Sequence, residues 1–172
     1  MEREIDNNMR KIILEWGIPN ILELESRNIE FVFDSNLIKN VDDYYKDLHC
    51  EYNDVRFCLY DFENENIIFS MDFFESNKTN IVLTGEKPHM RLELLNVNDY
   101  RFRKKGISSY YLKKLQEHCI ESGLSFIKVK ACANDKIFKN VSEENSLTQE
   151  ELEEFYKEKS TKEMPIKRFL LD

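Results

Sequence analysis

The segment at residues 92–133 most constrains the fold of this 172-residue chain. An apolar run at residues 92–97 leads into a basic turn at 101–105, and Gly106 then opens an amphipathic run. A second alternating apolar run follows at residues 126–132. This order predicts a strand, a cationic loop, a helix and a second strand parallel to the first, joined by a right-handed crossover.

Such a crossover places the amino terminus of the helix beside the carboxyl end of the first strand. The first-turn amides of a helix have no partners within it and its dipole is positive there, so an anion can bind. Arg103, Lys104 and Lys105 add positive charge, and Gly106 lacks a side chain that would keep a ligand from the backbone. We therefore predict a phosphate site. The alternative is a solvated basic turn with an ordinary loop glycine.

Residues 97–108 resemble the acetyl-CoA loop of the GNAT superfamily of N-acyltransferases. Arg103 and Gly106 match the Arg and first Gly of the family pattern, whereas Ser108 replaces the usual second Gly or Ala. Residues 146–156 resemble the last helix of the family, which carries a Phe-Tyr or Leu-Tyr pair, although the usual Gly-Phe does not follow here. The core of the resemblance covers about residues 90–157.

The resemblance implies an α/β fold with a GNAT-like mixed central sheet, antiparallel in its amino half. The parallel strand pair, joined by the crossover helix, would splay apart around the pantetheine arm of acetyl-CoA. Asn134 follows the second strand, where the family often has a cofactor-contacting Asn; an ordinary loop residue is the alternative. The other implied cofactor residues are Leu95, Asn96 and Val97 for the arm and Arg103, Lys104, Lys105, Gly106, Ile107, Ser108 and Ser109 for the diphosphate.

Acyl transfer to an amine requires a base, a donor for the oxyanion and a proton for the leaving thiolate. The resemblance assigns the thiolate proton to Tyr156, and the alternative is a tyrosine packed on the core beside Phe155. Glu93 is the candidate base, and strand alternation predicts that it shares a face with Arg91, Leu95 and Val97. The alternative for Glu93 is a surface or salt-bridged carboxylate, with water or a carbonyl as the base.

The whole chain, residues 1–172, is predicted to form a single domain. Residues 1–27 would form a packing helix and linker, and residues 90–157 the acetyl-CoA-binding core. Other patterns predict a strand at 28–34, a helix at 37–48, a hairpin of strands at 55–62 and 66–74, a loop at 75–80, either a strand or more of that connection at 81–83, a helix from Thr148 to about 157, and a last strand at 166–171.

Composition excludes several classes of function. The net charge of −8 disfavours a nucleic-acid binder. The absence of an eighteen-residue apolar run and of a signal peptide predicts a cytoplasmic protein that does not span a membrane. The four cysteines and three histidines show no metal-ligand spacing, so we expect no metal. Phe69, Phe73 and Phe74 belong either to the core or to a homodimer interface.

The sequence thus predicts an N-acetyltransferase that moves an acetyl group from acetyl-CoA to a primary amine by direct attack. The acceptor would be a small-molecule or peptide amine. The alternative is a weak or inactive CoA-binding sensor or interaction module with the same fold. An unrelated α/β nucleotide binder is disfavoured, because the chain has no glycine-rich phosphate loop.

Overall fold

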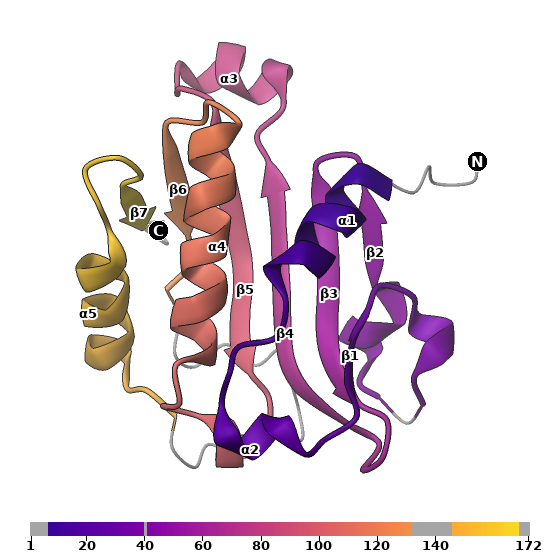
Figure 1. Ribbon diagram of the computed structural model, residues 1–172. Coiled ribbons are helices and arrows are strands. Elements are labelled where there is room, and N and C mark those ends of the chain that lie inside the picture. Colours follow the sequence, from indigo (N-terminus) through magenta and orange to yellow (C-terminus); the bar gives the residue numbers. More distant parts are fainter. Residues whose placement is uncertain (1–6, 40, 132–145, 169–172) are drawn as a thin grey trace.

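The computed structural model describes residues 7–39, 41–131 and 146–168 (Figure 1). Its helices are α1 (Asn7–Trp16), α2 (Leu22–Glu25), α3 (Lys78–Thr84), α4 (Ile107–Glu121) and α5 (Gln149–Lys159), with 3₁₀ turns η1 (Ser35–Leu37), η2 (Asp43–Asp47) and η3 (Tyr100–Phe102). Its strands are β1 (Ile29–Val32), β2 (His49–Glu51), β3 (Asp54–Asp61), β4 (Asn66–Glu75), β5 (His89–Val97), β6 (Phe126–Val129) and β7 (Ile166–Arg168).

The seven strands form one mixed sheet in the order β1-β3-β4-β5-β6-β7, with β2 paired to β3. The pairs from β1 to β5 are antiparallel, whereas β5 with β6 and β6 with β7 are parallel. Helix α4 makes the crossover from β5 to β6. This sheet confirms the predicted fold class, including its antiparallel amino half and the parallel pair joined by a helix.

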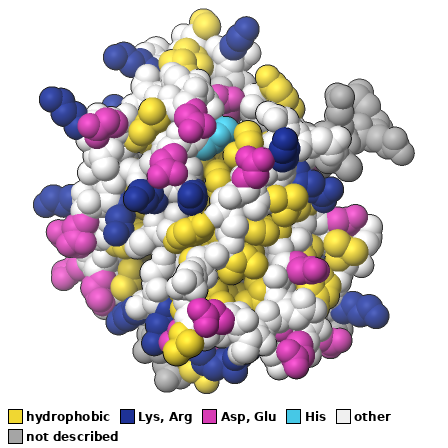
Figure 2. All heavy atoms as spheres, in the orientation of Figure 1, with side chains coloured by type: hydrophobic (Ala, Val, Ile, Leu, Met, Phe, Trp, Pro, Cys, Tyr) yellow, Lys and Arg dark blue, Asp and Glu magenta, His cyan; other side chains and the backbone are white. Residues whose placement is uncertain are grey.

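Helices α1 and α4 cover one face of the sheet, and α5 lies at the edge near β6 and β7 (Figure 1). The main hydrophobic core fills the space between these helices and the sheet, and it includes Ile13, Phe57, Phe69 and Leu115. The hydroxyl groups of Tyr110 and Tyr111 donate to carbonyls at the carboxyl end of α1, which ties α1 to α4. Basic and acidic side chains are interspersed over this face (Figure 2).

The opposite face carries a smaller core below η1 and η2. Val32, Cys58 and Tyr60 alternate with residues of the main core along their strands, so they point to this second face and pack against Tyr45 of η2. The Tyr45 hydroxyl also lies 2.8 Å from the Ser70 hydroxyl, which donates to the Asn98 amide oxygen. These contacts fix η2 on the sheet.

Several predicted elements are confirmed with small changes of boundary. The amino-terminal packing helix, the hairpin of β3 and β4, and the strand β5 all appear. Thr148 and Glu151 form the expected capping box at the start of α5. Phe69 and Phe73 are core residues, each no more than 2% exposed.

Two local predictions are wrong. Residues 37–48 form no long helix: Asp34 caps only one short turn, and Ile38 then adopts extended backbone and is buried in the smaller core. Burial against the sheet here outweighs local helix propensity. Residues 78–84 form α3, where the prediction was a loop at 75–80 and either a strand or more of that connection at 81–83. The helix forms because Asn77 accepts a hydrogen bond from the Asn80 amide and Gly85 ends the helix at φ +69°.

Within the described residues, no helix is both long enough and apolar enough to cross a bilayer.

Candidate active site

The parallel strands β5 and β6 pair over only part of their length. Residues His89 to Leu92 of β5 pair with Phe126 to Val129, while β5 itself continues to Val97. The stretch at residues 93–97 therefore has no described β6 partner along that edge. An unpaired strand edge presents backbone donors and acceptors that an extended ligand can satisfy. The resemblance implied that the pair splays here, and among the described residues the pairing ends where β6 ends, at Val129.

A bulge in β5 determines where Glu93 points. Leu92 pairs with Phe73 and Leu94 pairs with Asp72, which leaves Glu93 as the extra residue on β5. Glu93 and Arg91 form an ion pair at 3.0 Å, whereas Leu95 packs against the core below α4. The prediction that Glu93 shares a face with Leu95 and Val97 is wrong, because the bulge interrupts the alternation of side chains.

The basic turn after β5 is held by a buried carboxylate. Asp99 accepts hydrogen bonds from the amide of Arg101 at 3.0 Å and from its guanidinium at 2.9 and 2.6 Å. The side chain of Asn66 on β4 donates a further hydrogen bond to Asp99 at 2.9 Å. Phe102, 1% exposed, anchors the turn in the core. The charge of Arg101 is therefore committed to Asp99.

The three cations predicted to meet a diphosphate have different surroundings. The Nε of Arg103 donates to the Val97 carbonyl at 2.9 Å, and its Nη1 donates to the Ser146 hydroxyl at 3.0 Å. Lys105 forms an ion pair with Glu23 of α2 at 3.2 Å. Lys104 is exposed and adopts a positive φ of 61°. The turn thus contacts β5, α2 and the segment that leads into α5.

Gly106 begins α4 with φ +93°, a conformation that residues with side chains rarely adopt. No side chain caps the helix, so its first amides at residues 107–109 have no partners inside it. The side chain of Ile107 is buried in the core, while Ser108 and Ser109 are half-buried. Of the three, Ile107 thus has only its backbone available to a ligand.

Tyr156 lies on α5 and is 5% exposed. It packs into the main core, and the Phe155 ring meets it edge-on at 5.2 Å between centroids. Burial raises the pKa of the Tyr156 phenol, so the hydroxyl keeps its proton at neutral pH. This protonated form is the one that a general acid requires.

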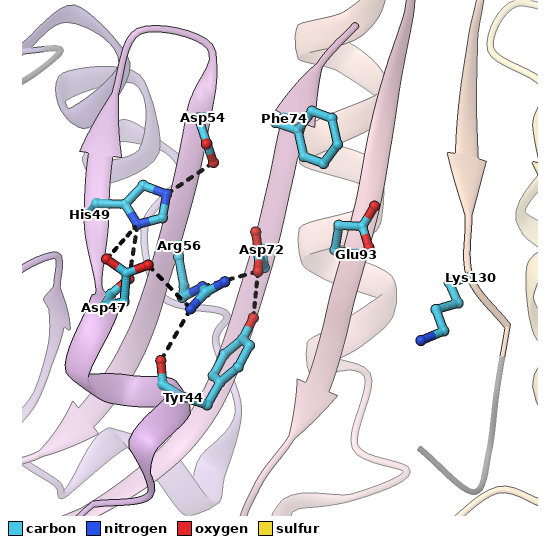
Figure 3. A pocket seen from close by; sticks show the side chains of 9 residues that line it. All are labelled: Tyr44, Asp47, His49, Asp54, Arg56, Asp72, Phe74, Glu93 and Lys130. Atoms are coloured by element: carbon cyan, nitrogen blue, oxygen red, sulfur yellow. Dashed lines mark hydrogen bonds and ion pairs between the residues drawn. The ribbon is translucent and has the colours of Figure 1, made fainter. Parts of the chain in front are cut away.

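A cavity of about 450 Å³ opens on the sheet face opposite α4 (Figure 3). Its residues come from η2, from strands β2 to β5 and from the end of β6. Glu93 on β5 and Lys130 after β6 both line it, on either side of the splay. The full lining comprises Tyr44, Asp47, His49, Asp54, Arg56, Asp72, Phe74, Glu93 and Lys130.

Charged groups on one side of the cavity form a connected network (Figure 3). Arg56 donates to Asp72 at 3.0 Å, lies 3.7 Å from Asp47 and stacks on the Tyr44 ring at 4.1 Å. The Tyr44 hydroxyl also donates to Asp72 at 2.6 Å, and both burial and the Asp72 charge raise its pKa. The hydrogen bond from His49 to Asp54, 2.9 Å long, raises the pKa of the imidazole.

Of these cavity residues, only Glu93 was predicted from the sequence to be a site residue. The alternating charges Asp54 and Arg56 on one strand, opposite Asp72 on the next, were the available signal. The contribution of η2 depends on packing that the sequence does not show. Asn134 lies outside the described residues, and no group of three or more metal-ligating side chains occurs within those residues.

No family model and no curated protein sequence matches the chain. Among solved structures, the chain is similar to three acetyltransferases. Two are aminoglycoside acetyltransferases from uncultured soil metagenomic samples, one in complex with trehalose and one with polyethylene glycol in unknown active-site density. The third is a ribosomal-protein-alanine N-acetyltransferase from Brucella melitensis biovar Abortus 2308.

The two metagenomic enzymes are 17% and 15% identical to this chain, and each has a TM-score of 0.41. The matches cover 63% and 64% of this chain and 79% and 83% of those structures. The Brucella enzyme is 13% identical with a TM-score of 0.43, over 70% of this chain and 94% of its own. These identities and scores are too low to assign an activity or any site residue.

Replacement of Gly106 by alanine is expected to lower the free energy of unfolding by roughly 1–2 kcal/mol, because the positive φ strains a residue with a Cβ. No atom lies within 4 Å of the added Cβ, so the cost comes from the backbone and not from a clash. Urea denaturation measures it. Gly106→Asn, which tolerates positive φ better, should cost less, and equal costs for the two variants would contradict the argument.

Asp99 should make the free energy of unfolding depend on pH. Burial alone would raise its pKa, but the hydrogen bonds from Arg101 and Asn66 lower it overall. Its stabilising contribution is therefore complete above the unfolded pKa of about 3.9 and is lost as the pH falls through the lower folded pKa. Denaturation at a series of acidic pH values should give a shallower dependence for Asp99→Asn. An unchanged slope would exclude this role.

Proposed function

We propose that this chain is an N-acetyltransferase of the GNAT superfamily that uses acetyl-CoA. One observation carries the proposal: β5 continues beyond its last pair with β6 at Leu92 and leads, through a tethered basic turn, to the positive-φ Gly106 at an uncapped helix terminus. The unpaired edge suits an extended amide chain, and the helix terminus suits a diphosphate. Coenzyme A combines these two chemical groups in one molecule.

The residues present fit this coenzyme. Amides at residues 107–109 and the charge of Lys104 and Lys105 would hold the diphosphate, with Ser108 and Ser109 adding hydroxyl groups. The β5 stretch from Leu95 to Val97 would contact the pantetheine arm. When bound, acetyl-CoA supplies an acyl group activated as a thioester.

The acceptor would enter from the cavity on the other face of the sheet. Glu93 lines this cavity beside the splay, so a primary amine there lies within the reach of a carboxylate base. Glu93 or a water molecule would take the amine proton. The ion pair with Arg91, 3.0 Å long, holds this carboxylate at the cavity. A small-molecule or peptide amine remains the proposed acceptor.

Tyr156 would hold the proton that the leaving thiolate needs. Its phenol is kept protonated by burial, and α5 packs it into the core on the same side of the sheet as α4. The other predictions, a cytoplasmic location and a homodimer, stay predictions.

Calorimetry with CoA, ATP and NAD tests the coenzyme, and a thiol-release assay with acetyl-CoA and a panel of amines tests the activity. We expect CoA alone to bind in the micromolar range and at least one amine to release thiol. Tight CoA binding without turnover on any amine would favour the sensor alternative. Absence of CoA binding would refute both.

Tyr156→Phe is expected to lower turnover at least tenfold, because it removes the proton donor for the thiolate. The affinity for CoA should change little, since the ring and its packing remain. Steady-state kinetics with calorimetry separate the two effects. Tyr52→Phe is the matched control, because Tyr52 is 81% exposed and lies in the turn between β2 and β3. Unchanged turnover in Tyr156→Phe would remove Tyr156 from the mechanism.

A further inference from the structure

Asn96 on β5 carries a buried side-chain amide nitrogen that has no hydrogen-bond partner among the described residues. Buried polar groups in native proteins are almost always paired, and an unpaired donor costs free energy comparable to a lost hydrogen bond. Each exception therefore calls for an explanation. One explanation is that the unpaired donor serves to bind a ligand.

The neighbours of Asn96 explain why its amide is unpaired. Its partner in the sheet register is Ser70 on β4, whose hydroxyl donates to Asn98 at 2.7 Å and also bonds the Tyr45 hydroxyl. The amide of Asn98 donates in turn to the Tyr45 hydroxyl. These three side chains form a closed ring of hydrogen bonds.

The position of Asn96 in the sheet indicates what would satisfy it. It lies four residues beyond Leu92, the last residue of β5 that pairs with β6, and so belongs to the splayed stretch. The next residue, Val97, accepts a hydrogen bond from Arg103 of the basic turn. Asn96 is therefore near the end of the splay where a diphosphate would bind.

We propose that the side-chain amide of Asn96 donates a hydrogen bond to an amide carbonyl of the pantetheine arm, in addition to any contact of the β5 backbone. This inference rests on the proposed function. The arm contains two amide groups between the diphosphate and the sulfur, and a strand advances only about 3.3 Å per residue. Asn96 therefore meets the part of the arm that follows the diphosphate, and it binds the coenzyme without touching the thioester.

The replacement Asn96→Leu tests this role, because leucine has nearly the same shape and no polar group. Two effects of opposite sign are expected. Without ligand, the urea midpoint of unfolding should rise, since the variant no longer buries an unpaired donor. The Kd for CoA should increase roughly fivefold to tenfold, the loss expected for one hydrogen bond. Urea denaturation and calorimetry measure the two effects.

A second probe separates the arm from the rest of the coenzyme. Adenosine 3′,5′-bisphosphate lacks the arm, so its Kd should be the same for the wild-type chain and for Asn96→Leu. Asn96→Ala removes the amide without added bulk. It must also raise the Kd for CoA and leave the Kd for adenosine 3′,5′-bisphosphate unchanged. The matched control is Asn80→Leu, an exposed asparagine on α3, which should leave both Kd values unchanged.

The outcomes distinguish a failure of the inference about Asn96 from a failure of the proposed coenzyme. If Asn96→Leu lowers stability, or binds CoA as the wild-type chain does, Asn96 is a structural residue and the inference fails. The inference also fails if both probes weaken equally. If the wild-type chain binds neither probe, the proposed coenzyme itself is wrong.

Discussion

The arrangement of the candidate site depends on the limited pairing between β5 and β6. All four residues of β6 pair with β5, and the pairing ends at Leu92 and Val129, where β6 itself ends while β5 continues to Val97. The bulge at Glu93 lies immediately after the last pair, so β5 changes direction where it loses its neighbour. Both the open strand edge and the orientation of Glu93 follow from this single change in the sheet.

The rest of the fold keeps that opening in a defined shape. Tyr110 and Tyr111 tie α4 to the end of α1, so the helix that begins at Gly106 is fixed on its sheet face. Asp99 secures the start of the basic turn, and Arg103 joins the end of β5 to the segment before α5. A ligand that bound at this turn would meet groups already held in place, which lowers the ordering cost of binding.

The elements that could be predicted correctly are those whose signal lies in residues close together in the sequence. The crossover segment, the capping box at Thr148 and the hairpin of β3 and β4 follow from periodicity and from capping residues close in the chain. The helix predicted at residues 37–48 is wrong, because packing of Ile38 and Tyr45 on the sheet decides the conformation there. The caps of α3, Asn77 and Gly85, were present in the sequence, but the residues around Asn77 were predicted to form a loop.

The same distinction applies to the candidate site. The basic turn and Gly106 are contiguous in sequence, so their position between β5 and the start of α4 could be predicted. The face of Glu93 could not, because one extra residue on β5 inverts the alternation, and a bulge is visible only in the register with β4. The cavity required η2, the four antiparallel strands β2 to β5 and the end of β6 to meet, which no local pattern encodes.

Each carboxylate of that cavity already lies beside a basic side chain. Asp72 and Asp47 face Arg56, Asp54 faces His49, and Glu93 faces Arg91. An ammonium group that enters must therefore exchange partners with a resident cation instead of meeting bare negative charge. The directions and spacing of the hydrogen-bonding groups in the cavity would then decide which amine fits.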